Sequence, residues 1–411
     1  MLLGTLGGWM SQHRRVWYAR ATYGEAEIAA VVSALRERSL TLTGGPAVHA
    51  FEDRVAALMG HTHGVMVNSG SSALMLAVAS HDLPAGSEVI TPALTFATTV
   101  APVVQRGLRP AFVDVEPDSF VVDVDRVEAM IGPETSAILV PDLVGNVPDW
   151  PRLRALADAH GLALIEDAAD TLGPTWNGAP TGSLADTTIG SFYASHVITC
   201  AGTGGLVAMR DPKRAERARQ LRGWGRRTAR GAESEALDAR MAVEIDGEPY
   251  DAKYVFDDLG FNFMPSELGA AFGLVQLDGL EAASEARRRN VARHRALLSR
   301  WPDWYRLPVQ RPEVQTAWHG FAFTLHADAP FSRNALQRFL EERGIQTRAV
   351  LTGNILRQPA LRGVDVRTDP AGYAEADRVM RQGLMIGCHQ ALEDADHDAI
   401  AAAFEAWAAR W

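Results

Sequence analysis

Lysine is almost absent from this chain of 411 residues. Its basic residues total 40, but only Lys213 and Lys253 are lysines, so the other 38 are arginines. Chemistry that needs a lysine amine as a covalent catalyst therefore has two candidates at most. Lys213 follows Asp211 and Pro212 at a predicted helix start, and Lys253 lies in the segment 250–254. We expect both lysines at the surface.

Cysteine is equally scarce. Cys200 and Cys388 are the only two. They are too few for a disulfide framework, for a four-thiolate metal site, or for the four ligands of an iron–sulfur cluster. We therefore expect no iron–sulfur cluster and no metal site, and we expect the two thiols to occupy a reducing compartment.

Long apolar runs and an excess of positive charge are missing as well. No run approaches the roughly 18 apolar residues of a membrane-spanning helix. The formal net charge is −10, and an acidic chain without basic runs lacks the positive face that binds nucleic acid. Residues 1–23 have no clear cleavage pattern, so we interpret them as an irregular N-terminal arm and not as a signal peptide. These absences predict a cytoplasmic protein with neither a membrane nor a nucleic acid as partner.

Apolar runs and amphipathic stretches alternate over the first two thirds of the chain. Seven short runs are typical of buried strands, at 65–67, 88–90, 111–113, 137–140, 162–165, 189–193 and 206–209. Helical periods separate several of them, as at 124–130 and 150–160. Strands buried on both faces and alternating with helices predict an α/β fold with a mainly parallel, seven-stranded sheet.

The pattern changes after about residue 265. Two long helical stretches come first, and the segments that follow are a strand at 321–325, a helix at 333–343, a strand at 347–351 and a closing helix at 396–411. We therefore predict a large domain over residues 24–265. A linking helix and a smaller α+β C-terminal domain would occupy residues 266–411.

Polar residues follow several of these strands, where open α/β sheets bind their ligands. After the first strand, segment 68–74 offers the hydroxyls and free helix amides that suit a phosphate, although helix capping alone explains such residues. After the fifth strand, Asp167 suits the protonated ring nitrogen of a cofactor, and capping of the next helix explains it equally well. After the sixth strand come Ser191, a candidate phosphate donor, and His196, whose lone imidazole is more often structural.

The residues of these motifs and their order along the chain resemble the DegT-type family of nucleotide-sugar aminotransferases and dehydratases. This family is a branch of the fold type I pyridoxal-phosphate enzymes. The resemblance covers residues 25–411 and is carried by six segments, at 68–74, 91–98, 166–170, 191–199, 259–262 and 270–277. It implies the fold type I pyridoxal-phosphate-dependent transferase fold, with the cofactor bound in the large domain.

The resemblance also implies roles for individual residues. Gly70, Ser71 and Ser191 would bind the cofactor phosphate, and Phe96 would stack on the pyridine ring. These four residues come from three different strand ends of the predicted sheet.

Two acids and an amide complete the implied site. Asp167 would bind the pyridine nitrogen and keep it protonated, so that the ring can act as an electron sink. Asp170 matches a position near the cofactor. Asn262 matches a residue that reaches the cofactor phosphate of a neighbouring subunit, which implies a homodimer with shared active sites.

At the position of the family's Schiff-base lysine this sequence has His196. A histidine there marks the 3-dehydratase branch, which segments 318–321 and 353–359 also resemble. The resemblance implies pyridoxal or pyridoxamine phosphate held without a covalent bond. It also implies a nucleotide-linked 4-keto-6-deoxyhexose as substrate and an amino donor such as glutamate. An imidazole with an ordinary pKa would move protons to and from the reacting atoms near neutral pH, so we expect His196 to be the catalytic acid and base.

Two other functions stay open. The protein would keep the cofactor but act on another carbonyl or amino compound, as a tailoring enzyme, a deaminase or an aminotransferase-like enzyme. Alternatively, it would be an inactive dimer partner, which the joint presence of Phe96, Asp167, Ser191 and His196 disfavours.

Three further features concern the surroundings of the site. Segment 200–205 lacks the acidic residue that the family carries before its paired glycines, which leaves the loop beside His196 and the substrate undetermined. Arg348 and Arg357 are candidates for phosphate or carboxylate contacts, with surface ion pairs as the alternative for each.

Overall fold

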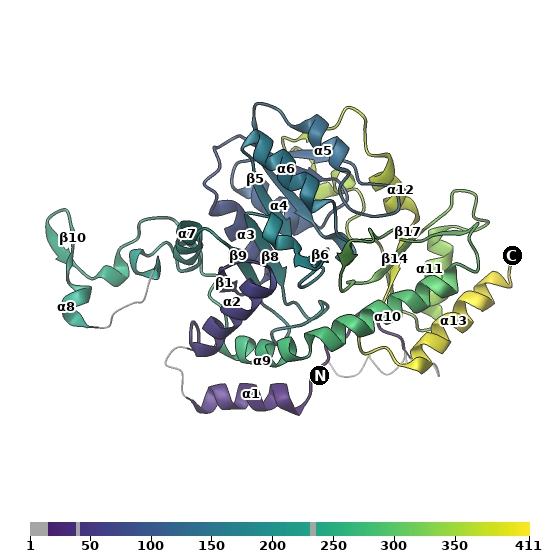
Figure 1. The fold of residues 1–411 in the computed structure, drawn as a ribbon, viewed down its shortest axis with the longest axis horizontal. Coiled ribbons are helices and arrows are strands. Elements are labelled where there is room, and N and C mark those ends of the chain that lie inside the picture. Colours follow the sequence, from purple (N-terminus) through teal and green to yellow (C-terminus); the bar gives the residue numbers. More distant parts are fainter. Residues whose placement is uncertain (1–14, 38–41, 231–235) are drawn as a thin grey trace, which may run out of the picture.

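An eight-stranded β-sheet forms the centre of the structure, a computed structural model that describes residues 15–37, 42–230 and 236–411 (Figure 1). The strands run in the order β1-β9-β8-β5-β4-β2-β3-β16, and in this sheet β9 alone is antiparallel to its neighbours. They are β1 (His63–Val67), β2 (Glu88–Pro92), β3 (Arg109–Val113), β4 (Thr135–Pro141), β5 (Ala163–Asp167), β8 (Thr187–Ser191), β9 (Gly205–Met209) and β16 (Arg367–Thr368). The seven predicted strands are confirmed. The predicted count missed β16 because two polar residues make no apolar run.

Both faces of this sheet are buried, because alternate residues of its strands enter different hydrophobic clusters. Val65 and Val67 pack with the helices of one face, whereas Met66 packs with helices of the other. The first face is covered by α3 (Gly70–Ala79), α4 (Ala97–Gln105) and α7 (Pro212–Arg222), and the second by α2 (Pro46–Leu58), α5 (Val124–Met130), α6 (Trp150–His160) and α9 (Glu267–Asp278). The fold is therefore the predicted α/β arrangement of helices around a mainly parallel sheet.

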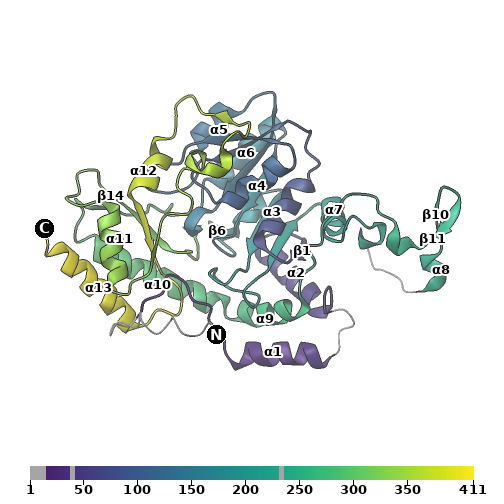
Figure 2. The same ribbon diagram turned by 180° about the vertical axis from the view of Figure 1, so that it is seen from behind.

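The C-terminal part contains a second, antiparallel sheet, which the 19-residue helix α10 (Leu280–Leu298) connects to α9 (Figure 2). Its order is β12-β14-β17-β15. The elements are β12 (Tyr305–Arg306), β14 (Phe321–Leu325), β15 (Thr347–Arg348), β17 (Gly383–Ile386), α11 (Arg333–Glu342), α12 (Ala374–Gln382) and α13 (Asp394–Ala408). The predicted strand at 347–351 is shorter than expected, because the chain turns where Gly353 N donates to Val350 O.

The two parts of the chain interlock at several points. β16 pairs with β3, and β13 (Val314–Gln315) pairs with β6 (Thr175–Trp176), whose other neighbour is β7 (Ala179–Pro180). Near the N-terminus, Val16 is 2% exposed and forms a bridge with Ile345. The domain boundary at residue 265 stays a prediction, and residues 1–14 of the predicted N-terminal arm lie outside the described residues.

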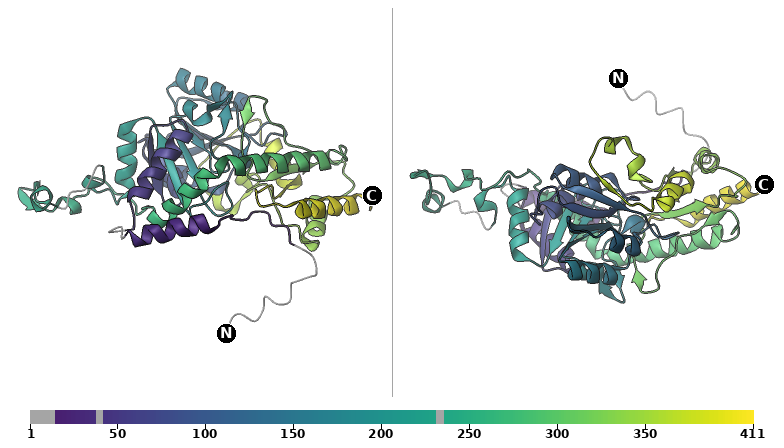
Figure 3. Two further views of the ribbon diagram at one scale, coloured as in Figure 1. Left: turned by 60° about the horizontal axis from the view of Figure 1, so that its bottom comes forward. Right: turned by 90° about the horizontal axis from the view of Figure 1, so that it is seen from above.

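Two segments expose apolar side chains. Helix α1 (Glu25–Arg36) lies along α9 but leaves Ile28, Val32 and Leu35 open to solvent. Beyond α7, α8 (Leu237–Arg240) and the hairpin of β10 (Val243–Ile245) and β11 (Glu248–Tyr250) extend away from the sheet (Figure 1 and Figure 3). We call residues 236–250 the protruding segment. Its exposed apolar residues are Leu237, Met241, Ile245 and Tyr250.

A pair of buried carboxyl groups lies at the carboxyl ends of β4 and β5. Asp142 and Glu166 are both 0% exposed. Glu166 accepts hydrogen bonds from Thr181 Oγ1 and Thr188 Oγ1, whereas Asp142 Oδ1 accepts one from Trp150 Nε1 at 3.0 Å. Burial and the neighbouring Glu166 raise the pKa of Asp142 well above its usual range. The raised pKa favours the protonated form of Asp142, with its proton shared between the two neighbouring carboxyl groups.

None of the helices within residues 15–37, 42–230 and 236–411 combines the length and the apolar character that crossing a membrane requires. The cytoplasmic location expected from the sequence stays a prediction.

The shared proton predicts how Asp142 variants behave. Asp142→Asn reproduces a protonated carboxyl, so the free energy of unfolding at pH 7 should stay within about 0.5 kcal/mol of the wild type. Asp142→Ala should lower it by about 2 kcal/mol, because Trp150 Nε1 and Glu166 lose a partner in a dry site. Urea unfolding monitored by tryptophan fluorescence measures both. An equal loss in the two variants would show that Asp142 is ionised in the folded protein.

Candidate active site

A cavity of about 430 Å³ opens where the carboxyl ends of β5 and β8 meet the N-terminus of α3. Parallel strands end at one edge of a sheet, so the residues that follow them converge there. Seven of the eight site residues predicted from the sequence line this cavity, namely Gly70, Ser71, Phe96, Asp167, Asp170, Ser191 and His196. Their roles stay predictions, but the structure brings them together.

One corner of the cavity is shaped for a phosphate. Ser69 caps α3 and accepts a hydrogen bond from Ser72 N, and Gly70 and Ser71, the first residues of the helix, line the cavity. Ser191 lies so close that a Cβ atom on Gly70 would come within 2.7 Å of its hydroxyl oxygen. The missing side chain of Gly70 therefore makes room for Ser191 beside the helix amides, which is the donor set that phosphate groups prefer.

Asp167 forms the floor of the cavity and is 4% exposed. Thr99 Oγ1 donates to its Oδ2 at 2.7 Å, and Ala169 N donates to its Oδ1 at 3.2 Å. Burial raises the pKa of Asp167 to about 6, and these hydrogen bonds partly oppose that rise. No basic side chain in the described residues forms an ion pair with it. A protonated ring nitrogen would supply the missing positive partner.

Aromatic rings border the opening. Phe96 precedes α4 and is 51% exposed, and Tyr193, in the loop after β8, is 60% exposed. Large apolar rings that remain exposed at the mouth of a cavity favour a planar ligand that can stack on them. The position of Phe96 fits the stacking role that the resemblance implies.

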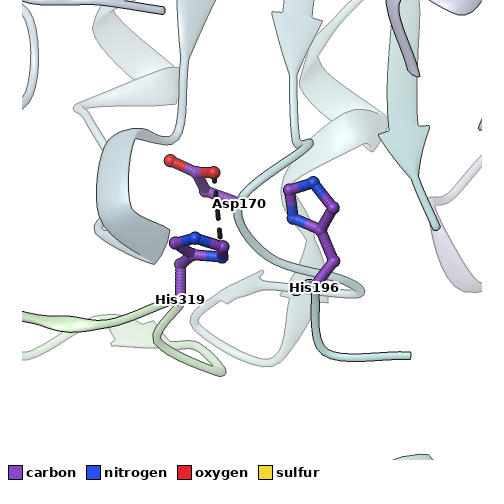
Figure 4. A group of neighbouring side chains, drawn as sticks. All are labelled: Asp170, His196 and His319. Atoms are coloured by element: carbon purple, nitrogen blue, oxygen red, sulfur yellow. Dashed lines mark ion pairs between the residues drawn. The ribbon is translucent and has the colours of Figure 1, made fainter. Parts of the chain in front are cut away.

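Two imidazoles and a carboxylate share one wall (Figure 4). His196 comes from the loop after β8, His319 from the segment before β14, and Asp170 from the turn after β5. The two imidazole centroids are 5.1 Å apart at an angle of 45°, and His319 Nδ1 lies 3.9 Å from Asp170 Oδ1. Nδ1 of each histidine is buried without a hydrogen-bond partner in the described residues. Both residues line the cavity, and each ring keeps one nitrogen without a hydrogen-bond partner in the described part of the protein.

The protonation of these groups differs from the expectation of an ordinary imidazole. Burial, and then neighbouring His319, lower the pKa of His196 to about 3, against the opposing effect of Asp170. Burial and the charge of Arg287 lower the pKa of His319 to about 3 as well. Because both rings are then neutral at pH 7, the contact between His319 and Asp170 is polar and is not an ion pair.

Segment 200–205 is a tight turn at the cavity edge. Cys200 forms a bridge with Thr203, and Thr203 and Gly204 line the cavity. Gly204 has a φ of 125°, which side chains other than glycine rarely adopt. Thr203 Oγ1 donates to Asn68 O at 2.6 Å, so the turn is tied to the strand end that precedes the phosphate corner.

Five basic or amide residues lie outside the cavity lining. Lys213 and Lys253 do not line the cavity; Lys213 is exposed on α7. Arg357 forms two hydrogen bonds with Asp377, which confirms the surface ion pair, and Arg348 lies outside the cavity. Asn262 is exposed and pairs with Gly223, so the structure does not bring it to the cavity of its own chain.

Sequence reasoning assigned no role to His319, although it recognised segment 318–321 as family-like. His319 lies before its strand, whereas the search followed the ends of strands. The one sign of a role for His319 in the sequence was that this second histidine lies in segment 318–321, which resembles the family. Thr99, which donates to Asp167, was missed for the same reason, because it lies inside α4.

Comparison with known proteins finds a match over residues 22–405 to the DegT/DnrJ/EryC1/StrS aminotransferase family. The chain is 37% identical over 385 residues to dTDP-4-dehydro-2,6-dideoxy-D-glucose 3-dehydratase of Saccharopolyspora spinosa, covering 91% of this chain and 82% of that protein. Its fold is similar to that of Escherichia coli GDP-4-keto-6-deoxy-D-mannose-3-dehydratase with bound hydrated PLP, with a TM-score of 0.84, 25% identity, and coverage of 95% and 100%. An aminotransferase from Streptoalloteichus hindustanus is also similar, with a TM-score of 0.82, 26% identity, and coverage of 96% and 99%. The fold is that of fold type I pyridoxal-phosphate enzymes.

The lowered pKa of His319 predicts a pH-dependent stability. The unfolded imidazole binds a proton below about pH 6.5, whereas the folded one stays neutral down to about pH 3. The neutral His319 imidazole therefore makes its full contribution to the free energy of unfolding above pH 6.5, and this contribution is lost as the pH falls towards about 3. Between pH 7 and pH 4.5, His319→Gln should lose about 2 kcal/mol less free energy of unfolding than the wild type. His160→Gln, at an exposed position of α6, is the control; equal losses in all three proteins would contradict the prediction.

Proposed function

Since the chain belongs to the DegT/DnrJ/EryC1/StrS aminotransferase family, we propose that it is a pyridoxal-phosphate-dependent 3-dehydratase of a nucleotide-linked 4-keto-6-deoxyhexose. The observation that carries this proposal is the position of His196 in the cavity, together with the absence of both lysines from its lining. A histidine cannot bind the cofactor covalently as a lysine does, but it can move protons. The similarity to two 3-dehydratases supports the same reaction.

The residues of the cavity fit pyridoxal phosphate and its aminated form. The helix amides at Gly70 and Ser71, with the Ser191 hydroxyl, would hold the phosphate, and Phe96 would cover the ring. Asp167 would bind the protonated ring nitrogen, and that cation would lower the raised pKa of the carboxyl. When bound, the cofactor supplies an electron sink beside the reacting carbons of the sugar.

His196 would serve as both base and acid. The neutral imidazole accepts a proton from a carbon at the reaction centre and returns it to the C3 hydroxyl, which leaves as water. Its pKa of about 3 makes it a weak base among the protein groups alone, but anionic phosphate groups in the cavity would stabilise the imidazolium form. Asp170, beside both imidazoles, acts in the same direction because its charge raises the pKa of His196.

The overall reaction would draw its electrons from an amino donor such as glutamate. Glutamate is oxidised to 2-oxoglutarate and its nitrogen leaves as ammonia, while the C3–OH bond of the sugar is replaced by C3–H. The water released at C3 is offset by the water consumed when ammonia is set free by hydrolysis, so no net water is produced. This balance needs no iron–sulfur cluster, which accords with the two cysteines of the chain. Glutamate as donor and the non-covalent state of the cofactor are parts of the proposal.

A second copy of the chain would complete the site. Among the described residues no lysine or arginine lines the cavity, although its expected ligands carry several phosphate charges. Asn262 is exposed near the strand end, since neighbouring Phe263 O accepts a hydrogen bond from Asn68 N. The protruding segment presents apolar side chains to solvent. We therefore propose a homodimer in which Asn262 reaches the partner's phosphate corner.

The first test separates dehydration from transamination. Incubated with glutamate and a nucleotide-linked 4-keto-6-deoxyhexose, the protein should yield a 3-deoxy sugar and ammonia. His196→Asn should reduce this rate by at least about 100-fold, because the proton carrier is lost, while cofactor binding changes little. Product analysis by mass spectrometry and absorbance titration with the cofactor measure the two effects.

Other outcomes would point elsewhere. A 4-amino sugar would indicate an aminotransferase, and cofactor fixed to Lys213 or Lys253 by borohydride would contradict the role of His196. Cofactor binding without turnover of any keto sugar would favour action on another carbonyl or amino compound, and no cofactor binding would favour an inactive partner.

The second test addresses the shared site. His196→Asn and Asn262→Ala should each be inactive or weak as homodimers, whereas a mixture exchanged between subunits should recover about a quarter of wild-type activity, because half of the random dimers contain one intact site. Subunit exchange is followed with differently tagged chains. Absence of recovery in verified mixed dimers would place Asn262 outside the partner's site.

A further inference from the structure

Arg287 of α10 is 1% exposed and binds the backbone of both active-site histidines. Its Nη2 donates to His196 O at 3.2 Å, and its Nη1 donates to Trp318 O at 2.8 Å and to His319 O at 3.2 Å. Its Nε donates to Gln390 Oε1 at 2.9 Å. One guanidinium therefore connects the loop after β8 with the segment before β14.

The partners of this guanidinium are unusual for a buried cation. A dehydrated arginine is normally compensated by a carboxylate, because burying an unpaired charge is costly. In the described residues Arg287 forms no ion pair, and its donors meet neutral oxygens and the thiol of Cys388, whose pKa is raised by burial. The planar fork of its donors suits such divergent acceptors, which a lysine ammonium would satisfy less completely.

The backbone amides of the two histidines do not join the two segments to each other. His196 N donates to Tyr193 O within its own loop, and His319 N donates to Val144 O. Gln390, which orients Arg287, also donates to Val197 O at 3.2 Å. Among the hydrogen bonds of the described residues, those of Arg287 join the backbone of both histidines to one side chain.

We propose that Arg287 is a positioning residue, which holds His196 and His319 at the separation and orientation that proton transfer in the cavity requires. This inference rests on the proposed function for its catalytic consequence, but the geometric role belongs to the protein alone. Arg287 lies outside the cavity lining, so it would act through the two histidine segments and not on a ligand.

The charge of Arg287 adds an electrostatic contribution. It lowers the pKa of both His196 and His319, in addition to the larger effect of burial, and so favours the neutral rings. The groups that face the two rings from the surrounding elements are Asp170, Tyr18, Tyr193 and Arg287, besides the histidines themselves. Of these, Arg287 is the cation.

Two variants separate position from charge. Arg287→Met removes both the hydrogen bonds and the charge. Arg287→Lys keeps the charge but loses the planar set of guanidinium donors that bonds to both histidine segments. In protein labelled at histidine, NMR titration without cofactor should show the pKa of His196 and His319 rising by about one pH unit in Arg287→Met and staying near the wild type in Arg287→Lys. His196→Asn and His319→Gln assign the two signals.

The kinetic effect should appear in both variants. We expect kcat to fall about 10- to 100-fold with KM for the sugar within about threefold, because a displacement of about 1 Å at the proton carrier slows the chemical step. The control is Asn290→Ala, one turn along α10, where Nδ2 donates to the backbone oxygens of Cys388 and His389 and contacts neither active-site histidine. This variant should leave the histidine titration unchanged and lower kcat less than twofold.

The outcomes decide the proposal. Unchanged histidine titration and unchanged kcat in a folded Arg287→Met protein would overturn it, as would an equal response in Asn290→Ala, which would indicate general loosening. If Arg287→Met does not fold, Arg287→Lys decides through the split between kcat and KM. If no keto sugar is turned over by the wild type, the imidazole chemical shifts of the labelled protein still test the positioning role, because they should change in Arg287→Lys although the pKa values there do not. Unchanged shifts in Arg287→Lys would contradict the positioning role independently of the proposed function.

Discussion

The shared carboxyl edge of the parallel strands is the constraint on which the rest of this structure depends. Because β5 and β8 run in the same direction, the residues that follow them arrive at one place, beside the N-terminus of α3. Glu166, Asp167 and His319 are buried there, so each of these groups must find a partner in the protein or in a ligand. Asp142 and Glu166 find one in each other, whereas Asp167 and the two histidines keep groups available to the cavity.

The charges around the cavity complement a ligand better than they complement one another. Asp167 has no basic partner in the described part of the chain, and the phosphate corner offers amides and hydroxyls without a cation. Arg287, the nearby buried cation, bonds to backbone oxygens behind the histidines. A ring nitrogen that carries a proton and a phosphate that carries negative charge match these two ends of the cavity.

Much of the fold and most of the site could be predicted from the sequence. Apolar runs identified the seven main strands, because strands buried on both faces need continuous apolar side chains. Because Asp167, Ser191 and His196 lie at or after the ends of such strands, the sequence was enough to predict that they lie close together. β16 and His319 were missed, because a two-residue polar strand leaves no pattern and a residue before a strand is not placed by the rule of strand ends.

What the sequence by itself determined is the chemistry that is available: a histidine, acids and serines at strand ends, and only two lysines in the chain. What only the tertiary structure decided is the state of those groups. It placed both lysines outside the cavity, lowered the pKa of His196 by burying it beside His319, and brought Arg287 against both histidine segments. The physical reason is that dehydration and hydrogen bonding depend on neighbours far apart in the chain, and the local pattern of residues does not record them.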